Sequence, residues 1–198
     1  MSKLAVLILA AGNSSRMGVS KQLLKWKESN LLQHSINTVK KLNTHNFVVL
    51  GANYSNIKPK IDDKSICVLN NQNWQKGLGN SIAFGIKYIQ ESLPIFDNVL
   101  LMLADQPLID AHFLNQMIET HKLNPKKIIC TLYQNERLGV PAIFNKIYFE
   151  DLLQLNDDKG AKELLKKYSS EVISLNGVKI VRDIDTLDDY EDLYKQYH

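Results

Sequence analysis

Short apolar runs alternate with longer amphipathic stretches along most of this chain. Five runs are continuously apolar and are predicted to be buried strands, at residues 4–9, 47–51, 66–69, 99–103 and 128–132. Between them, apolar residues recur at helical spacing and predict helices around residues 32–42, 82–93 and 113–118. Strands buried on both faces and separated by helices indicate an α/β fold, in which helices cover both faces of a mostly parallel sheet.

The alternation becomes less regular after about residue 133. The elements expected there are a short apolar piece at residues 139–144, helices around 148–155 and 161–168, strands at 171–175 and 179–182, and a last helix from Leu187 with Thr186 as its N-cap. No linker, repeat or low-complexity segment separates these parts. Residues 1–198 are therefore expected to form a single domain.

The composition is that of a globular protein, with 44% hydrophobic residues and a formal net charge of +3. The lysine pairs are scattered, which argues against a dedicated nucleic-acid surface. No apolar run reaches the length of a membrane span, and no signal peptide is recognisable. We expect a cytoplasmic protein without a nucleic-acid or membrane partner. Cys67 and Cys130 lie in strand-like runs and are expected to be buried free thiols.

The most informative stretch follows the first predicted strand. It reads LAAGNSSRMGVSKQLL from residue 9 to residue 24, and Gly12 and Gly18 lie near the ends of a flexible loop. Small residues let backbone N–H groups approach an anion closely, and Arg16 and Lys21 can neutralise its charge. The loop therefore predicts a polyphosphate site. It matches neither the Walker pattern nor the Gly-x-Gly-x-x-Gly fingerprint. The alternative is an ordinary loop with exposed cations.

Carboxylates follow two other predicted elements. Asp105 comes just after the strand at residues 99–103, so it is expected at the same edge of the sheet as the loop. A carboxylate there can hold Mg²⁺ together with substrate phosphates, whereas the alternative is a turn before Pro107. Asp183 and Asp185 alternate and would face one side of an extended chain. They could complete a metal site or form part of an acid-rich helix start.

The loop sequence resembles the opening motif of the Rossmann-like nucleotidyltransferases. Within that family, Leu-Ala-Ala-Gly-x-Ser-x-Arg-Met-Gly-x-x-Lys is most similar to the molybdenum cofactor cytidylyltransferase branch. The resemblance implies a three-layer Rossmann-like sheet and a nucleoside triphosphate bound by Leu9, Ala10, Ala11, Gly12, Arg16, Lys21 and Asp105. It assigns catalytic roles to Arg16, Lys21 and Asp105.

Two further segments extend the resemblance to the metal and the nucleotide. Leu-x-Asp-Gln-Pro is the family's metal-binding element and places Mg²⁺ on Asp105, with Asp185 as the second carboxylate. The pattern Asn-x-x-Trp-x-x-Gly-x-x-x-Ser-Ile resembles a second nucleotide-contacting segment. It implies that Asn71, Gly77 and Ser81 lie near the base and ribose.

Two other segments resemble parts that face the acceptor. They contribute Gly139 and Pro141 from one segment and Asp158 from the other. Some members of the family have a polar residue after the glycine, whereas this chain has Val140. The identity of the acceptor therefore stays open on the sequence.

The resemblance implies transfer of a cytidylyl group from CTP to a molybdopterin phosphate, with release of pyrophosphate and with Mg²⁺ as cofactor. Relatives that use guanine tend to have Leu-Ala-Gly-Gly, so Ala11 favours CTP by analogy. A recipient molybdoenzyme is a candidate partner. The alternatives are a nucleotidyltransferase acting on a sugar or polyol phosphate, or a nucleotide-binding chaperone that delivers cofactor without turnover.

Overall fold

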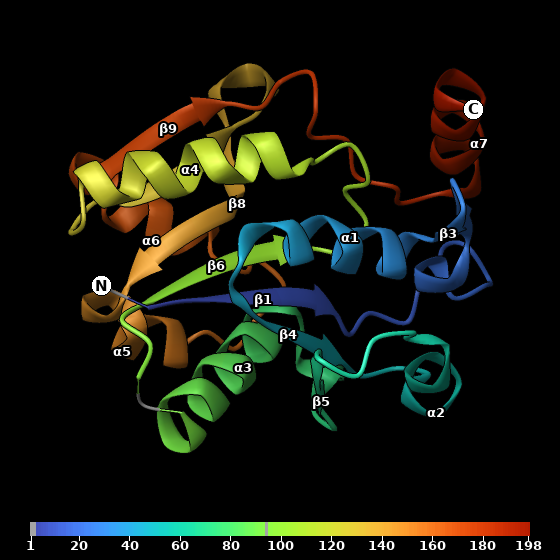
Figure 1. Cartoon of the computed structure of the whole chain (residues 1–198), viewed down its shortest axis with the longest axis horizontal. Helices are drawn as coiled ribbons and strands as arrows, with labels where there is room; N and C mark the ends of the chain where they lie inside the picture. Colours follow the sequence, from blue (N-terminus) through green and yellow to red (C-terminus); the bar gives the residue numbers. More distant parts are fainter. Residues whose placement is uncertain (1–2, 94) are drawn as a thin grey trace.

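A seven-stranded sheet forms the centre of the protein, seen in Figure 1 in a computed structural model that describes residues 3–93 and 95–198. The strands are β1 (Leu4–Ala10), β4 (His45–Leu50), β5 (Cys67–Asn70), β6 (Asn98–Leu103), β7 (Ile128–Leu132), β8 (Leu138–Asn145) and β9 (Val172–Asn176). Their order across the sheet is β5-β4-β1-β6-β8-β7-β9. Strand β8 runs antiparallel to β6 and β7, and the other neighbouring pairs in this sheet are parallel.

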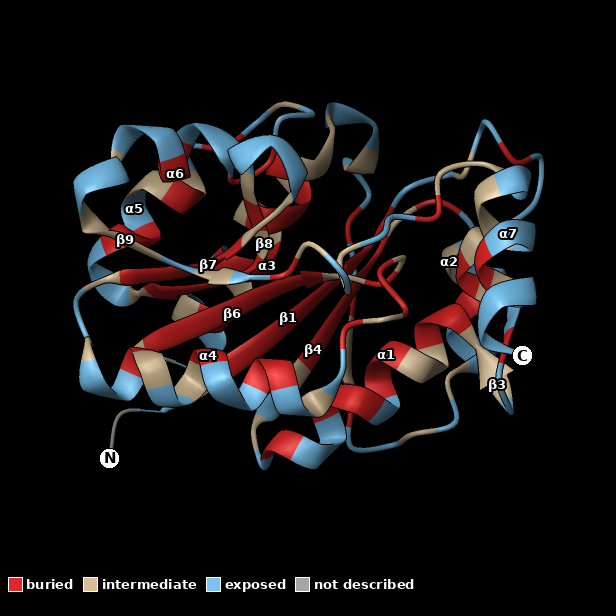
Figure 2. Ribbon diagram, turned by 90° about the horizontal axis from the view of Figure 1, so that it is seen from above, coloured by how far each residue is buried: buried red, intermediate tan, exposed pale blue. Residues whose placement is uncertain are grey.

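Helices cover both faces of this sheet (Figure 2). One face carries α1 (Leu31–Val39) and α4 (Ala111–Leu123), and the other carries α3 (Leu78–Ser92), α5 (Phe149–Leu153) and α6 (Lys162–Lys167). Alternate residues of β1 enter separate apolar layers, so that Leu7 packs in the layer of α3 and Ile8 in the layer of α1. The predicted three-layer, mostly parallel α/β arrangement is therefore confirmed.

A small hairpin and two helices lie beyond the carboxyl ends of β1 and β4 (Figure 1). They are the hairpin of β2 (Lys25–Trp26) and β3 (Ser29–Asn30), the short helix α2 (Tyr54–Ile57), and α7 (Leu187–Tyr197). Elements of two to four residues are too short to show a hydrophobic period, and the sequence did not predict β2, β3 or α2. The predicted N-cap of α7 is confirmed, because Thr186 and Asp189 form a reciprocal capping box.

One predicted strand, at residues 179–182, is wrong. The backbone N–H groups of Ile180 and Val181 both donate to the carbonyl of Gly177, at 2.9 and 2.8 Å. Because a turn uses these donors, they cannot extend the sheet beyond β9. The apolar side chains still pack against the core, which explains the strand-like sequence pattern.

The cysteines differ in their surroundings. Cys130 is buried, as expected, but Cys67 is only half-buried because β5 lies at the edge of the sheet, and both thiols are free. Burial raises the pKa of the Cys130 thiol to about 12, so this cysteine is a structural rather than a nucleophilic residue. No helix in residues 3–93 and 95–198 is long and apolar enough to cross a membrane.

Candidate functional site

The loop after β1 and the segment after β6 meet at one edge of the sheet. Strands β1 and β6 are parallel neighbours in which Leu9 lies opposite Leu103, so both chains leave the sheet at the same end. A cavity of about 320 Å³ opens there. Among the residues predicted from the sequence, those that line it are Leu9, Ala10, Ala11, Gly12, Lys21, Gly77, Ser81, Asp105 and Asp158. Ligands of open α/β sheets bind at this kind of position.

A buried glutamine holds the loop in place. The side-chain nitrogen of Gln22 donates to the carbonyls of Ala10 and Gly12, at 2.9 and 2.8 Å. The backbone N–H of Lys21 donates to the hydroxyl of Ser14 at 3.0 Å. These bonds fix the backbone from which the Lys21 side chain extends. The sequence does not reveal this role of Gln22, because a glutamine beside a lysine gives no sign that its amide is buried.

Four charged residues from distant parts of the chain meet beside the cavity. The ammonium group of Lys21 contacts the carboxylate of Asp105, and it donates to the carbonyl of Ile184 at 3.1 Å. It also lies 3.6 Å from Oδ1 of Asp185. A guanidinium nitrogen of Arg16 lies 3.6 Å from the same oxygen. Lys21 is largely shielded, with 19% of its side chain exposed, whereas Arg16 is 69% exposed and lies outside the cavity lining.

Asp105 has the features of a cation ligand. Its Oδ2 contacts Lys21, but its Oδ1 is buried and has no hydrogen-bond partner among the described residues. A buried carboxylate oxygen without a partner is costly, and a hard divalent cation would satisfy it. In the described residues no group of three or more His, Cys, Asp or Glu side chains is placed to hold a metal. Asp105 and Asp185 would therefore leave most coordination positions to phosphate oxygens and water.

The segment predicted to contact the base and ribose presents Ser81 rather than Asn71 to the cavity. Asn71 is 1% exposed and does not line the cavity. Its side-chain nitrogen donates to the hydroxyl of Ser81 at 3.1 Å, and its oxygen accepts from the backbone N–H of Asn73 at 2.9 Å. Asn71 therefore holds the start of α3, where Ser81 and the N-cap residue Gly77 line the cavity.

The residues predicted to face the acceptor lie in two places. Asp158 lines the cavity beside Gly77, where the loop before α6 packs on the start of α3. Pro141 is buried within β8, and neither it nor Gly139 lines the cavity. A Cβ atom on Gly139 would come within 2.9 Å of the Tyr133 ring, so this glycine is packed against an aromatic side chain.

Gln106, whose role cannot be read from the sequence, connects Tyr133, which packs on Gly139, to Asp183. It is 1% exposed, and its side-chain nitrogen donates to Tyr133 Oη and to Asp183 Oδ1, at 2.8 Å each. Asp183 therefore contacts Gln106, whereas Asp185 faces Lys21, and the two aspartates do not act as one pair. Loss of solvent around the carboxylate raises the pKa of Asp183, and the nearby charges of Asp105 and Asp185 add to the rise.

Gly77 gives a prediction about stability. Its φ is +101°, and a Cβ atom would come within 2.4 Å of Asp158 Oδ1 and 2.7 Å of the Asp157 carbonyl group. We expect Gly77→Ala to lower the free energy of unfolding by about 1–3 kcal/mol from backbone strain, with a further loss from the clash. Urea unfolding measures the difference. Gly12→Ala is the control, because no heavy atom lies within 4 Å of its added Cβ. Equal losses in the two variants would contradict the prediction.

Comparisons of the sequence identify its relatives. The family model for the MobA-like NTP transferase domain matches residues 6–172. The bifunctional protein GlmU of Francisella tularensis subsp. holarctica (strain OSU18) is 28% identical over 167 residues, which make up 83% of this chain and 35% of GlmU. The chain thus spans about a third of the length of the curated relatives it matches.

Solved structures resemble the fold over nearly its whole length. Rv0371c from Mycobacterium tuberculosis H37Rv superposes with a TM-score of 0.86 at 24% identity, over 98% of both chains. A complex of Rv0371C with manganese gives 0.82 at 23% identity, over 98% of this chain and 99% of that one. A cytidylyltransferase from Leptospira borgpetersenii gives 0.75 at 18% identity, over 98% and 86%. At these identities the likeness establishes the fold.

Proposed function

Because the chain belongs to the family of MobA-like NTP transferase domains, we propose that it is a nucleotidyltransferase. An oxygen of a phosphate-bearing acceptor attacks the α-phosphorus of a nucleoside triphosphate. The bond from that phosphorus to the bridging oxygen breaks, and pyrophosphate leaves. The observation that carries the proposal is the meeting of Lys21 and Asp105 at a cavity lined by the small residues that follow β1.

The chain's own residues would act by position and charge, which dominate such reactions. Lys21 has three N–H donors, and two of them already serve Asp105 and Ile184. The third can therefore reach a phosphate oxygen without loss of the other contacts. Arg16 is exposed at the rim and can turn onto the departing pyrophosphate. No nucleophilic side chain is needed, because an ionised acceptor phosphate is itself a nucleophile.

Asp105 and Asp185 are proposed to hold a divalent metal, with Mg²⁺ as the ion. The unpartnered buried oxygen of Asp105 supports this assignment, as does the manganese complex of Rv0371C. When bound, such an ion neutralises charge on phosphate oxygens during the transfer.

The specific reaction we propose is the transfer of cytidylyl from CTP to a molybdopterin phosphate, and a recipient molybdoenzyme would consume the product. The test measures pyrophosphate release from CTP and from GTP with molybdopterin, a sugar phosphate and a polyol phosphate. We expect release that depends on molybdopterin and stops when the metal is chelated. Release with a sugar or polyol phosphate alone would support that alternative. Tight CTP binding without release would support the chaperone.

The choice of base is a further expected result. Ala11 lines the cavity, and its carbonyl accepts from the backbone N–H of Ala52 at 3.0 Å, so its methyl group is held in place. That methyl should crowd a purine more than a pyrimidine. We expect CTP to be preferred to GTP by about 1–3 kcal/mol, or roughly ten- to two-hundred-fold in kcat/KM.

Ala11→Gly is the matched variant for this comparison. A smaller preference in Ala11→Gly would place the cause at the methyl group. A preference that this change leaves untouched would move the cause to the start of α3. Equal specificity constants for CTP and GTP in the unaltered protein would refute the cytosine assignment.

A further inference from the structure

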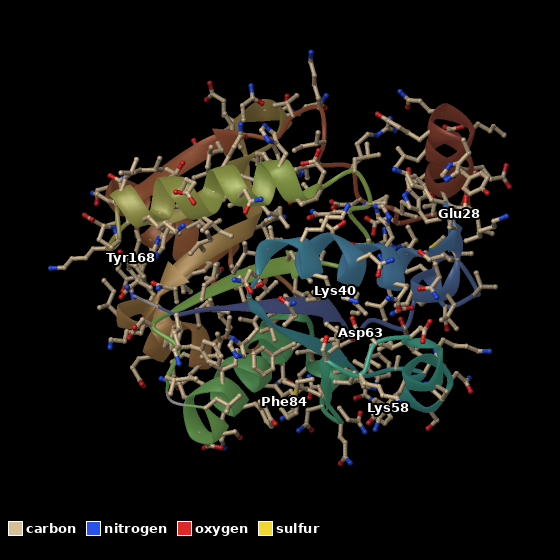
Figure 3. The ribbon with its side chains drawn as sticks, viewed as in Figure 1. Glu28, Lys40, Lys58, Asp63, Phe84 and Tyr168 are labelled. Atoms are coloured by element: carbon tan, nitrogen blue, oxygen red, sulfur yellow. The ribbon has the colours of Figure 1, made fainter. Side chains whose placement is uncertain are left out.

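A second cavity, of about 290 Å³, borders the same segment that carries Asp105. Residues 103–105 line the first cavity and residues 107–111 line the second. The other walls come from the β2–β3 hairpin, α1, the turn at residues 179–180 and the end of α7. Glu28, labelled in Figure 3, lies in this hairpin beside α7. Three of the lining residues are Lys27, Lys41 and Lys179, and we call this space the lysine cavity.

The three lysines are not neutralised by the protein. None of their ammonium groups lies within 4.0 Å of a carboxylate in residues 3–93 and 95–198. Lys40, one residue before Lys41, is paired with Asp63 at 2.8 Å (Figure 3). Unpaired lysines around one hollow concentrate positive potential there.

Only one of the residues that line the lysine cavity carries a carboxylate that could offset these positive charges. It belongs to Asp110, whose Oδ1 accepts from the backbone N–H of Phe113 at 2.8 Å and caps α4. Three ammonium groups and one carboxylate give the wall a net charge of +2. Burial lowers the pKa of His34 in the same wall, and the charges of Lys27 and Lys41 lower it further. His34 is therefore neutral at physiological pH, and the positive charge comes from the lysines.

The remaining wall is apolar. Pro107, Leu108 and Ile109 line one side, and the fully buried ring of Trp26 lies behind the cavity. The indole N–H of Trp26 has no acceptor among the described residues. The space thus combines a positively charged mouth with an apolar wall, which suits a small molecule with an anionic group and a compact apolar body.

We propose that the lysine cavity binds a small organic phosphate. This site is separate from the cavity of about 320 Å³ lined by Lys21 and Asp105, which we call the nucleotide cavity. A phosphate monoester carries about −1.5 to −2 charges at pH 7, which matches the wall, whereas a carboxylate would leave one cation unbalanced. Lysine ammonium groups bind phosphate as compact point charges. The inference does not depend on the transferase reaction, because it rests on a different cavity and different residues.

One segment of the chain, residues 103–111, contributes to the lining of both cavities. Nε2 of His34, which lines the lysine cavity, lies 3.0 Å from the carbonyl oxygen of Pro107. Ser35 donates to the carbonyl of Ala104 at 3.3 Å. A phosphate held in the lysine cavity would therefore lie beside the segment that carries Asp105, and α1 is bonded to that segment on both sides of Asp105.

The placement of the two tryptophans allows a specific test. Trp74 lines the nucleotide cavity and Trp26 the lysine cavity, and the chain has 2 tryptophans in total. In the Trp74→Phe protein labelled with ¹⁵N, the indole N–H signal of Trp26 reports on the lysine cavity alone. Phenyl phosphate is the probe, and benzoate is its carboxylate counterpart with the same ring. We expect a saturable shift with phenyl phosphate and at least tenfold weaker binding of benzoate.

Matched lysine variants decide whether the lysine cavity is responsible. Lys41→Met should weaken phenyl phosphate binding by at least about tenfold, as expected for loss of a charged hydrogen bond. Lys64→Met, at an exposed lysine outside both cavities, should leave it unchanged. Absence of a saturable shift, equal binding of benzoate, or equal affinity in the two lysine variants would each overturn the proposal. None of these results bears on pyrophosphate release, so the proposed transferase activity is tested separately.

Discussion

Replacing Lys21 by alanine is expected to lower kcat/KM for pyrophosphate release by about 10²–10³-fold, or about 3–4 kcal/mol, because a preorganised charge contact to the leaving group is lost. Because Lys21 follows a loop predicted to be flexible and open, an exposed side chain is the expectation from the sequence. The structure shows instead that 19% of its side chain is exposed and that its ammonium group contacts Asp105. Some loss of stability is therefore expected as well. Steady-state kinetics and urea unfolding on the same sample separate the two effects.

Lys40→Ala is the matched control for Lys21→Ala. It removes an ion pair with Asp63, and neither of these residues lines the nucleotide cavity. The hydrogen bond from Lys40 is the largest cause that lowers the pKa of Asp63, to about 2, so this pair too contributes to folding. Turnover should be unchanged in Lys40→Ala. Near-normal turnover in Lys21→Ala would contradict the assignment of the loop after β1 as a polyphosphate site. Arg16→Ala should also lose activity, but with little change in the free energy of unfolding.

Asp105→Asn is expected to lower activity by at least about 10³-fold. The change removes the charge that would hold the metal, and such a metal stabilises the charge on the transferred phosphate in the transition state by several kcal/mol. The amide keeps the shape of the side chain and can still accept from Lys21. Mn²⁺ affinity, measured by electron paramagnetic resonance, should fall together with the rate. Asp110→Asn is the control on the same segment, because asparagine caps a helix as well as aspartate does.

The metal assignment can fail in two distinguishable ways. Full activity in excess chelator, or normal Mn²⁺ affinity in Asp105→Asn, would contradict a metal on Asp105. If Asp185→Asn alone leaves both the affinity and the rate unchanged, only the second ligand is wrong. Either outcome leaves the family membership intact, because that rests on the match over residues 6–172.

Strands β1, β4, β6 and β7 were predictable because they are apolar on both faces. The loop after β1 was recognisable because small residues and fixed cations occur together there. The turn at residues 179–182 was not predictable. The apolar side chains of Ile180 and Val181 indicate burial, but they do not indicate which carbonyl group accepts from their backbone N–H groups. An apolar pattern records which side chains leave water. It does not record where the backbone donors go.

Polar residues at the site show the same limit. Asn71 is polar in a recognisable motif, yet its amide is occupied by neighbouring side chains and backbone. Gln22 and Gln106 belong to the site through carbonyl, hydroxyl and carboxylate partners that only the folded chain brings to them. The sequence shows which side chains are able to form hydrogen bonds. Whether those side chains face a ligand or bond to each other depends on the tertiary structure.

The contact between Lys21 and Asp105 has a thermodynamic consequence. A divalent ion that arrives alone at Oδ1 of Asp105 is repelled by the Lys21 ammonium group on Oδ2 of the same carboxylate, whereas a bound triphosphate brings negative charge that offsets both cations. Metal and nucleotide should therefore bind with positive cooperativity, and reciprocity requires each to raise the affinity of the other by the same factor. Titrations of Mn²⁺ with and without CTP measure that factor. On this account the ion enters and leaves with each triphosphate, as a co-substrate rather than a resident of the protein.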